Sequence, residues 1–152
     1  MTKRPQQARR AVLRVMYAAD VSGISVGDAL ESSRLTLDDL DGAFDWDFVA
    51  QRLSSVAEKR DEIDAEIRRL SPNWRLDRMA AVDRNLLRLG IFEILKEVTP
   101  PLIVINACVE LAKEFGTAST PGFINGLLDQ LCQDHDIPIE STDSESPPGR
   151  GR

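Results

Sequence analysis

The chain has 152 residues, a formal net charge of −6 at pH 7, one histidine and two cysteines. This length fits one domain, or two closely packed small halves, with enough apolar residues for a core. The apolar runs are short and interrupted by charge, and the basic N-terminus lacks the apolar region of a signal peptide. We therefore expect a cytoplasmic protein with no membrane association.

The charged residues are unevenly distributed along the chain. The only charged residues before Asp20 are basic, namely Lys3, Arg4, Arg9, Arg10 and Arg14. Acidic residues crowd the segment 38–47 and the tail 134–145. An acidic chain of this kind is not coated in positive charge, but it carries one basic segment at its start.

Apolar residues recur with helical spacing along nearly the whole chain, and no convincing strand alternation occurs, which predicts an all-α protein. The first helix is expected to start near Pro5 and to end at about Asp20, before Gly23. Its predicted core face consists of Ala8, Val12, Val15, Met16 and Ala19. Arg10, Arg14 and Tyr17 fall on the opposite face.

Two further helices are expected before residue 71. The first spans about residues 26–34, with Ser25 as its N-cap. After the acidic loop, a long helix over residues 47–70 carries a stripe at steps of four and three: Val49, Leu53, Val56, Arg60, Ile63, Ile67 and Leu70. Arg60 interrupts this stripe, so we expect it near a helix end or with its head extended to water.

The segment 82–97 is apolar almost all round, which is typical of a central helix. A short turn at residues 76–79 precedes it. Asp83, Arg84 and Arg88 lie near one end of this helix and are expected to reach the surface.

Two helices are predicted to complete the fold. Ile105, Cys108, Val109, Ala112 and Phe115 form the buried stripe of one, and Gly116 suits the left-handed position after it. Thr120 and Pro121 then provide an N-cap and a first helical residue, before a stripe of Ile124, Leu127, Leu128 and Leu131. The helix is expected to fade near His135. The polar, acidic and proline-rich residues 138–152 are predicted to be disordered.

The sequence offers little catalytic chemistry. The single histidine, His135, lies next to the tail that is predicted to be disordered, so a serine or cysteine triad and a histidine metal site both lack parts. Neither a P-loop nor a dinucleotide-binding glycine motif occurs. The acidic loop lacks the ligand spacing of an EF-hand. Cys108 and Cys132 occupy apolar helical positions, which predicts buried, reduced thiols. We expect no cofactor, no metal and no enzymatic activity.

Basic and aromatic residues give the chain its candidate binding features. The arginines of the first helix lie off its core face with no acid nearby in the sequence, which predicts a positive ridge suited to phosphates. Many solvated helices also carry arginines, so both interpretations stay open on this pattern alone. Phe115 and Phe123 are candidates for the core or for base stacking. Tyr17 requires either the other half of the protein or a partner.

Several short motifs resemble the NusB family of bacterial antitermination factors. They are Ala-Val-Asp-Arg at 81–84, Ile-Asn at 105–106, Glu-Leu-Ala-Lys at 110–113, Phe-Gly at 115–116 and Phe-Ile-Asn-Gly at 123–126. The resemblance implies a seven-helix bundle of two packed three-helix-like halves, joined around residues 71–79. The expected domain covers residues 1–137, with halves at about 1–70 and 80–137, followed by the tail 138–152.

The resemblance also implies a function. NusB proteins bind boxA RNA together with NusE, a small-subunit ribosomal protein, and support the RNA polymerase antitermination complex, notably on ribosomal RNA operons. The implied RNA-binding residues are Lys3, Arg4, Arg9, Arg10, Arg14, Arg88, Phe115, Phe123 and Asn125. Tyr17 and Asp83 are the implied NusE contacts.

The chain departs from the family pattern at two places. Pro5, Gln6 and Gln7 separate the basic residues of the N-terminal segment, and Gly122 stands where a lysine is common. Each missing cation weakens unaided RNA binding. A protein-interaction module or self-associating dimer without autonomous RNA binding is the alternative, so monomer and homodimer both stay open. A third hypothesis is a fragment, the RNA-binding domain of an RsmB-like ribosomal RNA methyltransferase, because the N-terminal part of that enzyme shares this fold.

Overall fold

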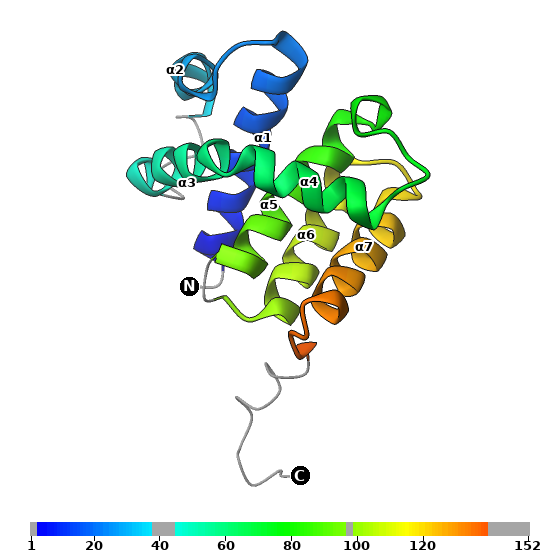
Figure 1. Cartoon of the computed structure of the whole chain (residues 1–152). Coiled ribbons are helices and arrows are strands. Elements are labelled where there is room, and N and C mark those ends of the chain that lie inside the picture. The colour runs from blue at the N-terminus through cyan, green and yellow to red at the C-terminus, as the bar shows by residue number, and fades with distance from the viewer. Residues whose placement is uncertain (1–2, 38–44, 97–98, 140–152) are drawn as a thin grey trace, which may run out of the picture.

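The computed structural model describes residues 3–37, 45–96 and 99–139. Within these ranges the chain forms seven α-helices and no strand. Figure 1 shows how these helices are arranged. They are α1 (Lys3–Ser22), α2 (Val26–Leu37), α3 (Trp46–Glu58), α4 (Arg60–Leu70), α5 (Ala81–Lys96), α6 (Pro101–Phe115) and α7 (Thr120–Asp134), with a short 3-10 helix η2 (Leu76–Arg78) before α5. The predicted all-α, seven-helix fold is confirmed. None of the described helices is both long and apolar enough to span a bilayer.

Helix α5 lies at the centre of the molecule. It packs against α1, α4, α6 and α7, and residues 85–94 are all buried. A helix contacted on several sides must be apolar around most of its circumference, which explains its sequence. Gly90 permits a close contact between α5 and α7, because a Cβ atom there would lie 2.9 Å from Cδ1 of Leu128 on α7.

The predicted face of α1 is its buried face. All five predicted core residues are at most 7% exposed, while Arg14 and Tyr17 are exposed. Gly23 ends the helix in the left-handed conformation, with φ +70, which an L side chain rarely adopts. The Oγ of Ser25 accepts a hydrogen bond from the backbone N of Asp28 at 3.0 Å, so it caps α2 as predicted.

The helix predicted over residues 47–70 is two helices that meet at Lys59. Apart from Arg60 and Leu70, its stripe residues are buried, so the periodicity survives the break. Arg60 begins α4 and its side chain is 56% exposed, which confirms the expectation for that position.

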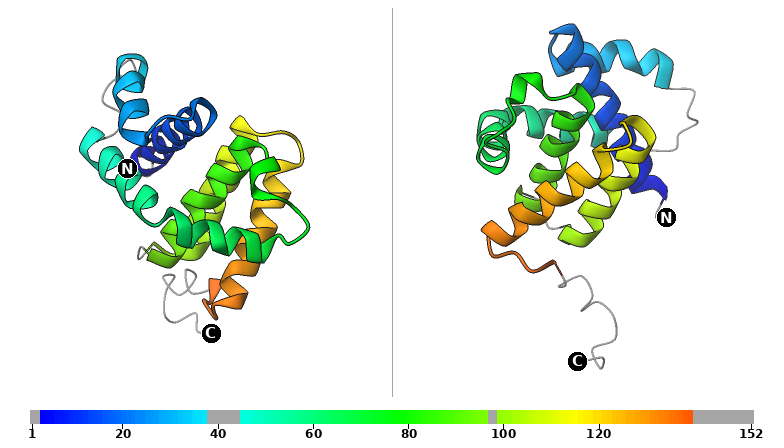
Figure 2. Two further views of the ribbon diagram at one scale, coloured as in Figure 1. Left: turned by 45° about the horizontal axis from the view of Figure 1, so that its top comes forward. Right: turned by 90° about the vertical axis from the view of Figure 1, so that its right-hand side faces the viewer.

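The helices form two groups, which Figure 2 shows from two sides. Helices α1, α2 and α3 pack on one another, and α5, α6 and α7 form the second three-helix group. Helix α4 packs mainly on α5 and also touches α7. The division at residue 70 stays a prediction, and this packing favours a boundary at Lys59 instead. Residues 38–44 of the acidic loop and 140–152 of the tail lie outside the described residues.

The start of α7 differs from the prediction. Gly116 has φ −100 and ψ −167, so it is extended and not left-handed. A Cβ atom there would lie 2.6 Å from the side chain of Thr120, which shows that close approach requires this glycine. Thr120 is itself the first residue of α7 and is buried, and the N-cap is Ser119. The predicted N-cap is therefore displaced by one residue.

Candidate nucleic-acid interface

The outward face of α1 carries the exposed cations of the predicted ridge. Arg14 is exposed and makes no ion pair with a residue that the structure describes, and Tyr17, on the same face, is 43% exposed. The Nη2 of Arg10 lies 3.1 Å from the Oε1 of Glu114 on α6, and Arg10 also donates to the Oε1 of Gln7. The Arg10 and Glu114 side chains are 25% and 43% exposed, so water screens this pair.

Lys3 and Arg4 lie in the first turn of α1, where only their backbone is described. Their predicted contacts with RNA stay predictions.

Arg9 points inward and not toward solvent. Its Nη2 lies 2.9 Å from the Oε1 of Glu93 on α5, and Arg52 of α3 lies 3.2 Å from the other oxygen of the same carboxylate. Glu93 is only 2% exposed. Burial lowers the pKa of Arg9, but the hydrogen bond and charge of Glu93 outweigh that effect and raise it.

The predicted positive ridge is therefore wrong for Arg9, which is turned toward Glu93, and it is partly neutralised at Arg10 by Glu114. The partners of Arg9 and Arg10 lie 84 and 104 residues away in the sequence, which local charge patterns do not reveal. Arg9 secures α1 on α5, and Arg10 and Arg14 remain on the accessible side.

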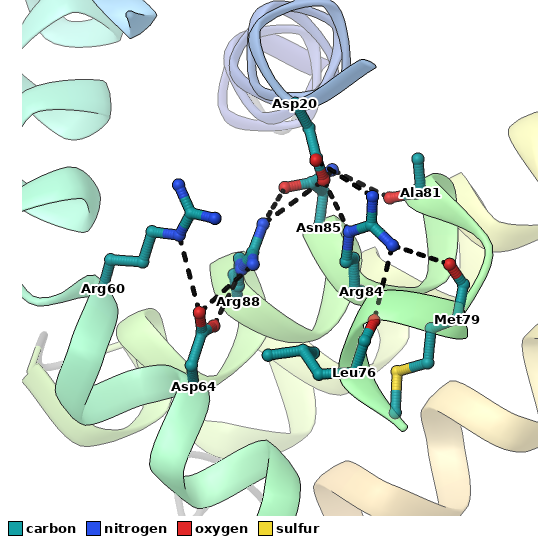
Figure 3. A network of polar contacts seen from close by, with 9 residues as sticks. All are labelled: Asp20, Arg60, Asp64, Leu76, Met79, Ala81, Arg84, Asn85 and Arg88. Atoms are coloured by element: carbon teal, nitrogen blue, oxygen red, sulfur yellow. Dashed lines mark hydrogen bonds and ion pairs between the residues drawn. The ribbon is translucent and has the colours of Figure 1, made fainter. Parts of the chain in front are cut away.

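Arg88 belongs to a buried polar network, seen in Figure 3, that joins α1, α4 and α5. Its Nε donates to the Oδ1 of Asp64 at 2.8 Å, and its Nη1 donates to the Oδ2 of Asp20 at 3.3 Å. Arg84 binds both oxygens of Asp20, at 2.7 and 2.9 Å. Asn85 also donates to Asp20, at 2.8 Å.

The expectation that Arg88 reaches the surface is wrong, because it is 5% exposed and held by two carboxylates. Its predicted contact with RNA gains no support from this position. Burial raises the pKa of Asp20, but the hydrogen bonds from Arg84 and Asn85 and the charges of Arg84 and Arg88 lower it below its ordinary value.

Tyr17 stands beside a groove of about 530 Å³ between α1, α2, α5 and α6. Arg14, Val82 and Phe115 also line this groove. Phe115 is half-buried and packs against the core, and its predicted role in base stacking stays a prediction. Asp83 is partly buried and accepts a hydrogen bond from the Oγ1 of Thr120 at 3.0 Å. The structure thus brings three predicted site residues, Arg14, Tyr17 and Phe115, to one groove.

The aromatic residue that sequence reasoning missed is Trp74, in the linker between α4 and η2. It is 62% exposed, and its ring centroid lies 6.1 Å from that of Phe123 in an edge-to-face arrangement. Phe123 is half-buried at the start of α7, and Asn125 is exposed two residues later. The sequence carried a signal for this residue, because a tryptophan between Asn73 and Arg75, in a linker that begins with Ser71-Pro72, belongs to no helical stripe.

These arrangements can bind anions and stack planar groups. Within the described residues, no group of three or more histidine, cysteine, aspartate or glutamate side chains is placed to hold a metal ion. Cys108 and Cys132 are free and buried. Burial raises the pKa of Cys108 to about 12, with Glu93 adding to the shift, so this thiol is not poised as a nucleophile.

The fold and this surface define a class of small all-helical proteins with a basic first helix beside exposed aromatic residues. The comparisons then identify the family. The NusB family model matches residues 6–133, so the chain belongs to the NusB family.

Individual relatives agree with this membership. The transcription antitermination protein NusB of Anaeromyxobacter dehalogenans is 39% identical over 132 residues, which are 87% of this chain and 92% of that protein. The protein of the same name from Myxococcus xanthus is 40% identical over 128 residues, covering 82% and 91%.

Two solved structures share the fold. T. maritima NusB matches with a TM-score of 0.75 and 29% identity, covering 91% of this chain and 96% of that one. A chain from the crystal structure of antitermination factors NusB and NusE in complex with dsRNA matches with the same TM-score, at 24% identity, over 88% and 99%. The predicted family is confirmed.

Proposed function

We propose that this protein is a transcription antitermination factor that recognises boxA RNA in nascent transcripts together with NusE. It acts in the cytoplasm by binding and not by catalysis, and it supports RNA polymerase during processive transcription. The relatives are named transcription antitermination proteins, and one structural neighbour is a chain from a complex of NusB and NusE with dsRNA. The observation that carries the proposal is the outward face of α1, where Arg10 and Arg14 lie beside Tyr17.

Each part of this surface has a physical role in the proposal. Arg10 and Arg14 bind phosphates, and the Arg10 guanidinium is released from Glu114 at little cost because that ion pair is solvated. Phe123 and Asn125 contact bases or sugars, since an exposed amide forms hydrogen bonds and an aromatic ring stacks. Tyr17 contacts NusE through its ring and phenol, and Asp83 contacts NusE through its carboxylate.

The test is fluorescence anisotropy of a short boxA-type RNA, with and without NusE, at two salt concentrations and against a scrambled RNA. We expect selective binding that NusE strengthens. Arg14→Glu is expected to weaken binding and to reduce the slope of log affinity against log salt by roughly 0.7, the value for one lost single-strand phosphate contact. Arg78→Glu, an equal charge change at an exposed residue of η2, serves as the control.

Arg9→Glu is a poor probe of RNA contact, because it places a second carboxylate against the buried Glu93. Tyr17→Ala is expected to weaken the NusE complex and to leave binding of RNA alone unchanged. If the folded protein binds NusE but no RNA under any condition, the protein-interaction module is the correct function.

A further inference from the structure

A second basic surface is separate from Arg10 and Arg14, neither of which lines it. It is a groove of about 610 Å³ between α4, the 71–77 linker and the start of α5. Five arginines and three aspartates line it, and Trp74 stands among them. None of the residues predicted for RNA contact except Arg88 lies in this groove.

The arginines of this groove divide into an inner and an outer set. Arg84 and Arg88 are held inside by Asp20 and Asp64. The outer set faces solvent: Arg60 is 56% exposed, Arg75 is 69% exposed, and Arg68 is exposed with no ion pair to any residue in the described ranges.

The inner arginines neutralise two of the three carboxylates that line the groove, Asp20 and Asp64. Asp64 lies between Arg60 and Arg68 on one face of α4, since the three are spaced by four residues. Arg88 donates to both oxygens of Asp64, at 2.8 and 3.2 Å, so Asp64 presents little net charge to the groove. Arg60 and Arg68 are separated by eight residues, which is about 12 Å along a helix, and both are positioned to contact one extended phosphate chain.

Trp74 adds a stacking platform to these cations. Its indole is 62% exposed and meets the edge of Phe123, a residue of the proposed RNA surface. An exposed indole between arginines suits an unpaired base with its flanking phosphates, whereas an acidic peptide would leave the ring unused. Its contact with Phe123 makes the groove continuous with that surface.

We propose that this groove binds single-stranded RNA, with a base stacked on Trp74 and phosphates held by Arg60, Arg68 and Arg75. This proposal rests on the proposed function in one respect, since the RNA that the groove binds is the unpaired RNA that continues beyond the boxA element. The binding chemistry itself requires no boxA sequence.

The direct test uses the fluorescence of Trp74 in the full-length protein. The chain has two tryptophans, so Trp46→Phe leaves Trp74 as the sole reporter. Titration with hexauridylate is expected to quench this variant with a saturable curve. The matched Trp74→Phe variant, which reports on Trp46, is expected to stay unchanged. No quenching of Trp74 at low salt overturns the proposal.

Charge variants test the phosphate contacts. Arg68→Glu combined with Arg75→Glu is expected to weaken hexauridylate binding roughly tenfold or more, and Arg78→Glu, outside the groove, to change it less than about twofold. Asp77→Asn is expected to strengthen binding, because it removes the carboxylate 2.9 Å from Arg75. A gain of this kind does not arise from misfolding. If Arg78→Glu weakens hexauridylate binding as much as the double variant does, the site is not localised to the groove and the proposal is overturned.

A boxA-type RNA extended by six unpaired uridines separates this proposal from the proposed function. The extension is expected to tighten binding in the wild-type protein, and the Arg68→Glu, Arg75→Glu variant is expected to lose that gain while it still binds the unextended element. Failure of the boxA function appears instead as equal binding of boxA and scrambled RNA, with the Trp74 response intact. If the double variant still binds the extended RNA more tightly than the unextended RNA, the extension does not bind in the groove and the proposal is overturned.

Discussion

Arginines lie on both the inner and the outer side of α1, but those on the inner side stabilise the fold and those on the outer side are available to a ligand. On the inner side, Arg9 meets Glu93 at one end of the helix, and Asp20 meets Arg84 and Arg88 at the other. On the outer side, Arg14 has no ion-pair partner among the described residues, and Arg10 has a solvated one. The difference teaches that burial of the partner carboxylate, and not the number of arginines, separates cations that stabilise the fold from cations available to a ligand.

The largest expected effect comes from breaking the inner side at Arg88. Arg88→Ala leaves Asp64, which is 6% exposed, without its principal partner. Removal of one member of a buried ion pair costs about 3–5 kcal/mol of unfolding free energy. Urea denaturation followed by circular dichroism measures this loss. Arg14→Ala on the outer side is the control, with an expected change within about 0.5 kcal/mol. Similar losses from both variants would contradict the comparison.

The helices and the core were accessible to sequence analysis because they depend on local spacing. The stripes of α1, α3 and α4 repeat every three or four residues, so their buried faces followed from the pattern. The break at Lys59 did not, since both sides of it continue the same stripe. The extended conformation of Gly116 depends on contact with Thr120, which a left-handed cap rule does not include.

The candidate site was harder to predict than the helices, because whether an arginine is buried or available to a ligand depends on ion-pair partners that are distant in the sequence. Arg88 and Asp64 are 24 residues apart, and Arg9 and Glu93 are 84 apart. One signal was available, since Glu93 lies between Phe92 and Ile94 in a helix that is apolar almost all round, and a buried carboxylate requires a cation. That requirement points to an arginine partner without identifying it. Tyr17 and Arg14 were placed on the exposed face correctly, because that face needed only the helical period.

A second test compares two glutamates that each receive an arginine from α1. Glu93→Gln removes the buried charge shared by Arg9 and Arg52, and we expect it to cost about 1.5–3 kcal/mol, as for hydrogen bonds to charged groups. Glu114→Gln removes the partner of Arg10, which is 43% exposed, and is expected to cost less than about 1 kcal/mol. Urea denaturation of both variants measures the difference.

The two glutamate variants also separate stability from RNA affinity. Glu114→Gln is expected to strengthen binding of boxA RNA slightly, because it removes a carboxylate that competes for Arg10. Glu93→Gln offers no such gain, since Arg9 faces the core. Stronger RNA binding by the Glu93 variant would show that Arg9 exchanges between the two sides.

A smaller effect is expected from pH at the Asp20 end of α1. The pKa of Asp20 is lowered in the folded protein, so its network adds stability above the unfolded pKa of about 3.9. That contribution is lost as the pH falls from about 4 through the lower folded pKa. The stability difference between the wild-type protein and Asp20→Asn should therefore shrink on acidification over this window. Urea unfolding at a series of pH values measures it, and a constant difference from pH 6 to 3 would contradict the assignment.

The smallest expected effect is the reactivity of the two cysteines in the native protein, which reports how well the core that contains them is protected from solvent. Burial raises the pKa of Cys108 to about 12 and that of Cys132 to about 11, so neither thiol in the native protein should react with a disulfide reagent at pH 8. Both should react once urea unfolds the chain. Counting modified thiols by absorbance tests this directly.

The same reaction tells local opening from global unfolding. Glu93 and Arg9 both act on the pKa of Cys108, whereas Asp129 is the charged group that acts on Cys132. Loss of the ion pairs of Glu93 with Arg9 and Arg52 should loosen the packing of α1 on α5. Modification of Cys108 should then become faster by a larger factor than modification of Cys132. Mass spectrometry of each modified cysteine in Glu93→Gln measures the two rates. Equal acceleration would mean that the whole bundle opens together, and the inner side of α1 would then have no stability separate from that of the fold.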